Sequence, residues 1–256
     1  MDRVDRLSDY DAFAWVYNKE WGPKHSGLFF SIVESLALRE LRAGAHILDL
    51  CCGTGHVAAM LAERGYRVTG VDASEEMLRF ARQNAPTAEF VLDDARRFKR
   101  PEAFDAVVST FDSLNHVMRS EELAAVFRNV HASLRAGGVF LFDLNTERNY
   151  KEQWRGSFGI VDDDYACIVR SDYCAADRTA TFHATIFIKG DAWSRSDVAL
   201  AQRWHPDEEV RVALAAAGFE RVDACQHSPS RGVETLTPAA TRAFYLCCKG
   251  RTPRET

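Results

Sequence analysis

The sequence predicts an α/β protein in which a mostly parallel, doubly wound sheet carries an antiparallel β insertion. First, short apolar runs that end in an acidic residue, at 47–49, 67–72 and 89–94, alternate with segments of helical periodicity. Strands that alternate with helices form a parallel sheet with helices on both faces. Second, the pattern changes after Asn145 to the period-2 alternation of antiparallel strands.

The parallel part of the chain is divided by start and stop signals. Ser74 and Ser120 each precede two glutamates, which predicts helices beginning there, after the second strand and after a fourth strand at 104–109. The second of these helices should end at the glycine pair 137–138, before a fifth strand at 139–143. A helix should also precede the first strand, because apolar residues recur there at helical spacing: Leu28, Phe29, Ile32, Val33, Leu36 and Ala37.

Residues 151–204 are expected to form the antiparallel insertion. Apolar runs at 158–161 and 165–169 flank three consecutive aspartates and predict a hairpin. A second hairpin should follow, with its turn near 176–178. The segment is too short for an independent domain, so we expect it to lie over the active-site end of the main sheet. There it would act as a lid, as a dimer surface, or as both.

The remaining segments complete the domain organisation. Residues 1–43 should form an N-terminal helical arm, residues 44–150 the cofactor-binding core, and residues 205–256 the end of the main sheet. In the last segment, Pro206 and the acids after it predict a helix that Gly218 ends. Apolar runs at 219–225 and 243–248 then predict the final two strands.

The first strand leads into a glycine turn, which is typical of a nucleotide-type cofactor site. Gly53 and Gly55 permit positive φ and close approach to a ligand, and the next helix points its N-terminus at that ligand. Asp49 would repel a pyrophosphate but attract the α-ammonium of a methionine moiety. The segment from Gly53 to Ala58 also fits the G-x-G-x-x-A form of NAD-binding domains.

With Asp49, Gly53 and Gly55, the chain resembles motif I of the class I S-adenosylmethionine (SAM) dependent methyltransferases, Asp/Glu-x-x-x-Gly-x-Gly. Asp72 at the end of the second strand could accept both ribose hydroxyls of either SAM or NAD. A third acid-tipped strand, at 89–94, favours SAM. The resemblance covers residues 45–145 well and implies a Rossmann-like sheet of seven strands, the last inserted antiparallel.

The resemblance also implies a set of cofactor-binding residues: Tyr10, Tyr17, Asp49, Cys51, Gly53, Gly55, Asp72, Ala73, Met77, Asp94, Ala95 and Thr110. Asp94 and the Ala95 backbone would face the adenine edge. Tyr10 and Tyr17 resemble a cofactor-covering arm whose rings can stabilise a sulfonium by cation–π attraction. The alternative for these two rings is that they only cap the core.

The segment after the fourth strand concerns the acceptor. Its Phe111, Ser113 and His116 are similar to small-molecule methyltransferases, including sugar N,N-dimethyltransferases and glycine N-methyltransferase-like proteins. His116 is a candidate base because imidazole titrates near neutral pH; the alternative is a helix-start histidine bonded to backbone. His183 is a second candidate, if the alternation of its strand turns it toward the acceptor rather than solvent.

Composition limits the partners. A net charge of −5 and a pI near 5.9 argue against a nucleic-acid partner, which would require clustered Lys and Arg. The seven cysteines lack C-x-x-C spacing, so we expect no metal and free thiols in a reducing cytoplasm. No segment has the ~18 uninterrupted apolar residues of a membrane span, and no secretory leader is evident.

We therefore expect a cytoplasmic SAM-dependent methyltransferase that methylates an N or O atom of a small-molecule acceptor and could form a homodimer. Two alternatives remain open. An NAD-dependent oxidoreductase would need a Tyr-x-x-x-Lys or a His/Asp catalytic set downstream, and no Tyr-x-x-x-Lys occurs. A non-catalytic SAM-binding subunit would be excluded only by activity.

Overall fold

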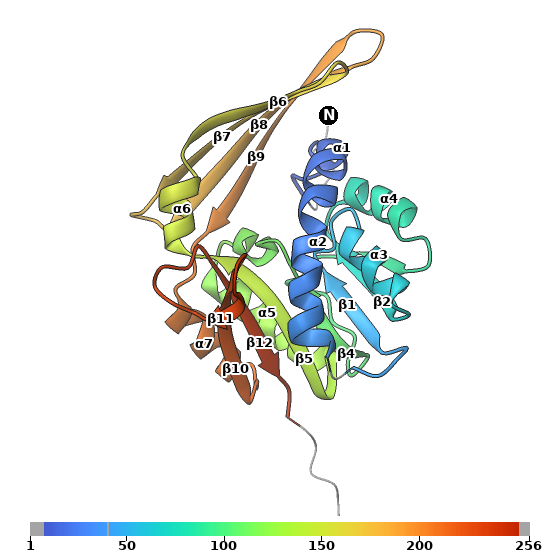
Figure 1. The fold of residues 1–256 in the computed structure, drawn as a ribbon, viewed down its shortest axis with the longest axis vertical. Coiled ribbons are helices and arrows are strands. Elements are labelled where there is room, and N and C mark those ends of the chain that lie inside the picture. Colours follow the sequence, from blue (N-terminus) through green and yellow to red (C-terminus); the bar gives the residue numbers. More distant parts are fainter. Residues whose placement is uncertain (1–7, 40, 251–256) are drawn as a thin grey trace, which may run out of the picture.

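A computed structural model describes residues 8–39 and 41–250. Figure 1 shows a main α/β body with a second sheet extending from it. The main sheet has eight strands in the order β11-β10-β12-β5-β4-β1-β2-β3. In chain order these are β1 (His46–Leu50), β2 (Arg67–Asp72), β3 (Glu89–Leu92), β4 (Phe104–Ser109), β5 (Leu134–Asn145), β10 (Arg221–Ser228), β11 (Gly232–Thr235) and β12 (Arg242–Cys248).

The predicted α/β class with a parallel core is confirmed. β1 to β5 pair in parallel, and β12 lies antiparallel between β5 and β10. The predicted number of seven strands is wrong, because β11 adds an eighth at the edge. This four-residue strand is held by antiparallel pairing with β10, from Cys225 opposite Thr235 to Ser228 opposite Gly232. A strand this short has too little alternation to be recognised in sequence.

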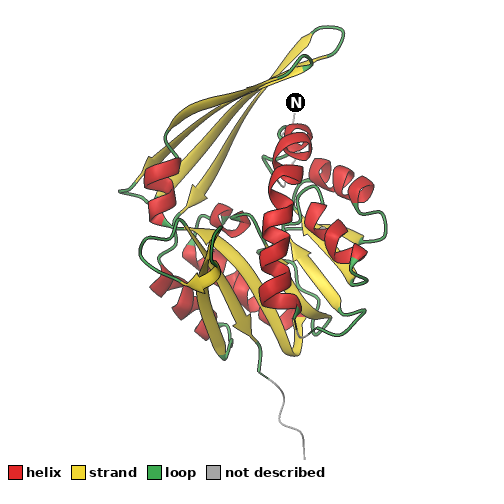
Figure 2. Cartoon of the chain, viewed as in Figure 1, coloured by secondary structure: helices red, strands yellow, loops and turns green. Residues whose placement is uncertain are grey.

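Helices cover both faces of the main sheet (Figure 2). They are α1 (Ala14–Val16), α2 (Gly22–Val33), α3 (His56–Glu63), α4 (Glu75–Asn84), α5 (Ser120–Ser133), α6 (Glu147–Gln153) and α7 (Asp207–Ala216), with π-helical turns η1 (Tyr17–Trp21) and η2 (Glu34–Leu38) and a 3₁₀ turn η3 (Ser113–His116). One core joins α5 and α7 to the strands through residues such as Phe127 and Phe140. The other joins α2, η2 and α3 through residues such as Val33 and Leu61.

Two predicted boundaries are wrong, and one helix was not predicted. The helix predicted to reach the glycine pair 137–138 ends at Ser133, because Leu134 already has extended geometry and starts β5. The third strand ends at Leu92 rather than among the acids after it. The helix α6 was not expected; Thr146 caps its N-terminus by accepting a hydrogen bond from the Asn149 amide.

The insertion is one continuous meander rather than two separate hairpins. Its strands are β6 (Gly156–Val161), β7 (Tyr165–Cys174), β8 (Thr179–Lys189) and β9 (Trp193–Arg203), each antiparallel to the next. β7 spans both predicted hairpins, so the second turn joins it directly to β8. The domain boundaries drawn from the sequence remain predictions, and residues 1–7 of the expected arm lie outside the described range.

The N-terminal segment lies between the insertion and the main body (Figure 1). Phe13 and Val16 pack against the inner face of the insertion, in a cluster with Cys167 and Ile186. Ala14, which lies between Phe13 and Val16 in the chain, packs on α4. This segment therefore connects the two sheets. Within residues 8–39 and 41–250, no helix is long and apolar enough to cross a membrane.

Candidate active site

The turn after β1 has the backbone geometry that its glycines permit. Gly53 has φ +52° and Gly55, the N-cap residue of α3, has φ +76°. A Cβ on Gly55 would lie 2.9 Å from the Ala81 Cα of α4, so this position excludes a side chain on steric grounds as well. The turn thereby brings the start of α3 close to the end of β1.

The carboxyl ends of β1 to β4 meet at the edge where the strand order reverses, the usual ligand position in such sheets. A cavity of about 380 Å³ opens there. Nine of the twelve residues expected to bind the cofactor line it: Tyr10, Tyr17, Cys51, Gly53, Asp72, Ala73, Met77, Asp94 and Ala95. Asp49 and Thr110 instead line a small adjoining cavity, and Gly55 only shapes the turn.

Asp72 holds the glycine turn from the neighbouring strand. Its two carboxylate oxygens accept hydrogen bonds from the Gly53 amide at 2.8 Å and the Ser74 amide at 2.9 Å. Burial raises the pKa of Asp72 to about 6, although these amides oppose the shift. Each oxygen keeps a further lone pair, so both could also accept ribose hydroxyls.

Asp49 supplies a test of whether this site fits SAM. Its Oδ2 is buried and has no hydrogen-bond partner among the described residues. Burial, with a smaller contribution from nearby Asp72, raises the pKa of Asp49 to about 7. A buried acceptor without a partner is costly, and an ammonium group beside it would relieve that cost. The residues present therefore fit the methionine end of SAM.

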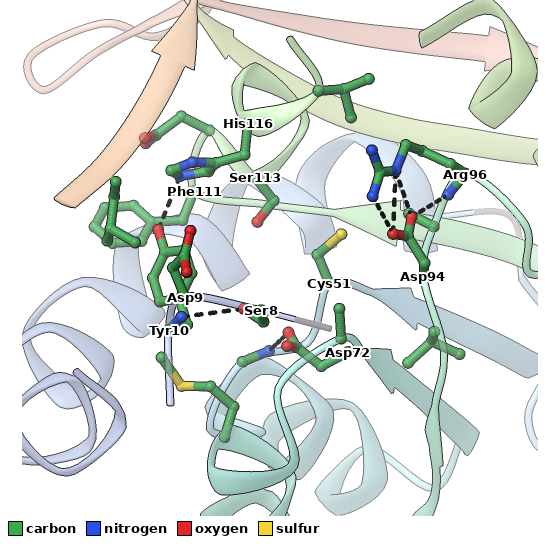
Figure 3. A pocket seen from close by; sticks show the side chains of 18 of the residues that line it. Ser8, Asp9, Tyr10, Cys51, Asp72, Asp94, Arg96, Phe111, Ser113 and His116 are labelled. Carbon is green, nitrogen blue, oxygen red and sulfur yellow. Dashed lines mark hydrogen bonds and ion pairs between the residues drawn. The ribbon is translucent and has the colours of Figure 1, made fainter. Parts of the chain in front are cut away.

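Asp94 is bonded to Arg96, which is not among the residues predicted to bind the cofactor. Arg96 donates from Nε to Asp94 Oδ1 at 2.9 Å and from Nη2 to Oδ2 at 2.5 Å (Figure 3). Although burial raises the pKa of Asp94, its bonds to Arg96 outweigh that effect and keep the pKa below its usual value. Arg96 also lines the cavity, so it belongs to the candidate site.

A second cavity of about 300 Å³ lies between the first cavity and the insertion. Aromatic rings dominate its wall, including Phe13, Trp21, Trp154 and Phe182. The two cavities share a set of lining residues: Tyr10, Tyr17, Phe111, Asp112, His116 and Leu200. A group held in one cavity can therefore face a group held in the other.

His116 lies in this shared wall with a defined tautomer. Its Nδ1 is 2.7 Å from the Ala201 carbonyl oxygen, which can only accept, so Nδ1 carries a proton. Its Nε2 accepts from the Tyr10 hydroxyl at 2.8 Å (Figure 3). It also accepts from Gln202 Nε2 at 3.1 Å. Burial lowers the pKa of His116, with Asp112 opposing, so the ring is neutral near pH 7.

The structure does not bring His183 into either cavity. Its side chain is exposed, and the neighbouring Phe182 lines the second cavity instead. Side chains alternate between the two faces of a strand, so His183 faces away from the cavity wall. The expectation that His183 takes part in catalysis is therefore wrong on geometry.

Comparisons with known proteins agree with this geometry. A sequence profile described as a methyltransferase domain matches residues 47–138. The Bacillus subtilis protein YqeM is 33% identical over 252 residues, which cover 95% of this chain and 98% of YqeM. The Streptomyces venezuelae dTDP-3-amino-3,4,6-trideoxy-alpha-D-glucopyranose N,N-dimethyltransferase is 30% identical, with 93% of this chain and 100% of that enzyme covered. The chain belongs to the SAM-dependent methyltransferases.

Solved structures share the fold of this methyltransferase. A SAM-dependent methyltransferase from Clostridium acetobutylicum superposes with a TM-score of 0.75 at 22% identity, over 95% of this chain and 100% of that one. DesVI of Streptomyces venezuelae gives a TM-score of 0.70 at 22% identity, over 98% and 99% of the two chains. The predicted SAM cofactor is confirmed, and the comparisons give no support to the NAD-dependent alternative.

Sequence reasoning missed an ion network in this methyltransferase. Arg242 of β12 contacts Asp143 of β5 through Nη1 and Asp112 Oδ1 through Nη2, the latter at 2.8 Å. Gln202 of β9 donates to Asp112 Oδ2 at 2.6 Å. Asp112 directly follows the noted Phe111, and two consecutive positive φ values there mark a strained turn. Arg242 and Gln202 have no local motif, because only the tertiary fold brings β9 and β12 to this turn.

Proposed function

We propose that this methyltransferase transfers the methyl group of SAM to an N or O atom of a small molecule held in the aromatic cavity. The observation that carries the proposal is the wall shared by both cavities, which contains a neutral His116 whose unprotonated Nε2 accepts from the Tyr10 hydroxyl, a contact that an acceptor group could replace. Bound SAM supplies an electrophilic methyl on a sulfonium. The chain then needs to align the acceptor and take its proton.

Residue roles follow from these positions. Asp49 would receive the α-ammonium and Asp72 the ribose hydroxyls, while the rings of Tyr10 and Tyr17 would lie near the sulfonium. His116 Nε2 would accept the acceptor's proton, because Nδ1 is already committed to the Ala201 carbonyl. The imidazolium so formed is stabilised by the nearby Asp112 carboxylate, which raises the pKa of His116 against the effect of burial.

The names of the relatives support a small-molecule acceptor. The Streptomyces venezuelae relative is named for N,N-dimethylation of a dTDP-linked amino sugar, and a matching rat enzyme is glycine N-methyltransferase, 33% identical over 42% of this chain. Both names specify nitrogen. The second cavity, of about 300 Å³, is of a size for a sugar or an amino acid and not for a nucleic-acid duplex.

We also propose the insertion as the contact between two copies of the chain. Its outer face carries exposed apolar side chains, with Val161 82%, Trp193 53% and Ile168 43% exposed. Patches of this kind are typical of protein interfaces. Analytical ultracentrifugation should give the molecular weight of a dimer for the wild type and that of a monomer for a Val161→Glu, Trp193→Glu double variant. A monomeric wild type would contradict the proposal.

The function is tested by replacing the proposed proton acceptor. His116→Gln keeps an amide near the same place but removes the base, so turnover should fall about 10²–10⁴-fold. Affinity for S-adenosylhomocysteine (SAH) should stay within a few-fold. The exposed His183→Gln is the matched control and should keep full turnover. If His116→Gln loses less than about threefold in rate, His116 is structural and the proposal of a base at this position fails.

A further inference from the structure

The charges around the acceptor cavity select what can bind there. Arg242 is enclosed by two carboxylates, Asp112 and Asp143, and its guanidinium also lies over the rings of Phe29 and Phe111 at 5.1 and 5.8 Å. Asp143 is itself fixed, since its oxygens accept from the Phe111 amide at 2.6 Å and the Asp112 amide at 2.9 Å. Arg242 thus serves to hold the strained turn.

The charged side chains that line the cavity balance one another. Among the described residues that line it, the permanently charged side chains are Asp112 and Arg242, and Asp143 lies directly behind them. Burial lowers the pKa of His25 and of His116, so neither adds a positive charge near pH 7. Asp112 and Arg242 therefore offset each other, and Asp143 is covered and has its pKa raised by burial, so the cavity offers no surplus positive charge to an anion.

Such a wall is unsuited to a phosphorylated acceptor. Recognition of a phosphate or diphosphate uses Arg or Lys groups with free donors, often in bidentate geometry. Here the guanidinium donors already face carboxylates at hydrogen-bonding distance. Bringing a phosphate beside Asp112 would add like-charge repulsion in a buried site, where it is weakly screened.

The same wall is suited to a cation. Asp112 Oδ1 accepts from Arg242 and Oδ2 accepts from Gln202, and each oxygen retains a lone pair for another donor. The Gln202 amide nitrogen that contacts Asp112 is also 3.1 Å from His116 Nε2, so the carboxylate and the base are neighbours. Aromatic faces around them can stabilise a positive charge as well.

On the basis of the proposed function, we infer that the acceptor is a small, phosphate-free amine and that Asp112 is the specificity-determining residue that binds its ammonium group. Burial of the ammonium favours loss of its charge. His116 Nε2 takes one proton, and the freed nitrogen lone pair forms the bond to the methyl carbon. The electrons of the broken carbon–sulfur bond remain on sulfur, which becomes the neutral thioether of SAH.

The acceptor class can be tested without knowing the acceptor. The wild-type enzyme is incubated with methyl-labelled SAM and a polar metabolite extract, and labelled products are separated on cation and anion exchangers at pH 7. Unreacted SAM is itself a labelled cation, so a control without enzyme fixes its position on the cation exchanger. A labelled product that the cation exchanger retains apart from SAM supports the inference. Label retained by the anion exchanger, or a neutral labelled ether or ester, overturns it while leaving methyl transfer intact. Absence of any labelled product contradicts the proposed function instead.

A defined set of probes tests the same point by affinity. Benzylamine and benzyl alcohol differ in charge, and glucosamine and glucosamine 6-phosphate differ by one phosphate; each is titrated into the SAH-bound enzyme by calorimetry. We expect the amine to bind more tightly than the alcohol and the phosphate to weaken binding at least about tenfold. Equal or tighter binding of the phosphorylated probe, or failure of both amines to bind, overturns the inference.

Asp112→Asn then assigns the effect to one residue. Loss of the charge should raise KM for the amine acceptor about 10- to 100-fold, the range for one charge-assisted hydrogen bond. The kcat should fall as well, because Asp112 also stabilises the His116 imidazolium. SAH titration checks that the variant is folded. Asp197→Asn, an exposed position paired with Arg195 on the insertion, is the control and should match the wild type. An unchanged KM in a folded Asp112→Asn enzyme overturns the role given to Asp112.

Discussion

Asp49 and Asp72 are buried carboxyls whose proposed ligands favour the ionised form. Burial raises the pKa of Asp49 to about 7 and of Asp72 to about 6, above the unfolded value near 4. An ammonium or a pair of hydroxyls binds the carboxylate better than the neutral acid. Cofactor affinity should therefore increase with pH, by up to about tenfold per unit for one coupled group, and level off above pH 7.

Calorimetry of SAH binding from pH 5.5 to 8 measures this dependence. Titrations near pH 6.5 in buffers of different ionisation heat should also detect proton release. Asp49→Asn should flatten the upper part of the curve, and a flat wild-type profile would contradict the assignment of both acids. For the protein without ligand, the pH dependence has the opposite sign. As the pH rises from about 4 to 7, the free energy of unfolding should fall, because the folded chain retains protons that the unfolded chain has lost.

The site shows which single residues a sequence can identify. Asp49, Gly53 and Asp72 lie at strand ends next to glycine or a helix start, and this local pattern alone singles them out. Asp112 and Arg242 carry charge into the acceptor cavity but belong to no short motif. Their pairing depends on β12 inserting between β5 and β10, which is a property of the tertiary fold.

At the scale of elements, strands with strong local signals were predicted at their observed ends, as for β2 and β4. The errors are at places where pairing decides the outcome. Gly137 and Gly138 indicated a helix end, yet β5 begins at Leu134 because Leu134 pairs with Phe104. Likewise β11 exists through its pairing with β10, and alternation in four residues is too weak to predict it.

The strand–turn–helix unit gives a stability prediction with an internal control. Gly55→Ala places a methyl at positive φ and 2.9 Å from Ala81 Cα, so the free energy of unfolding should fall by about 2–4 kcal/mol. Gly65 also has positive φ, +82°, but a Cβ there meets nothing within 4 Å. Gly65→Ala should therefore cost only about 1–2 kcal/mol. Urea unfolding of both variants separates the cost of positive φ from the cost of the contact with Ala81. Equal losses of unfolding free energy in the two variants would show that α3 and α4 are not closely packed at Gly55.

At the scale of the whole molecule, the N-terminal segment connects the cofactor to the insertion. Tyr10 and Tyr17 line the cofactor cavity, while Phe13 between them packs on the insertion, with its ring centre 5.6 Å from that of Phe182. Gln202 and Ala201, near the end of β9, contact His116. The N-terminal segment and the end of β9 thus contribute to the walls of both cavities. Ordering of these segments when the cofactor binds should therefore also order the acceptor cavity.

This arrangement predicts a specific pattern of hydrogen exchange. SAH binding should slow amide exchange at residues 8–21 and, through Phe13, at 180–186 of the insertion, by severalfold or more. Amides of β4 and β5 should not change, because the core already protects them. In Phe13→Ala the protection at 8–21 should persist while that at 180–186 is lost, since the variant removes the ring that joins the two segments. Protection confined to the glycine turn and the end of β2 would mean that the cofactor site acts independently of the insertion.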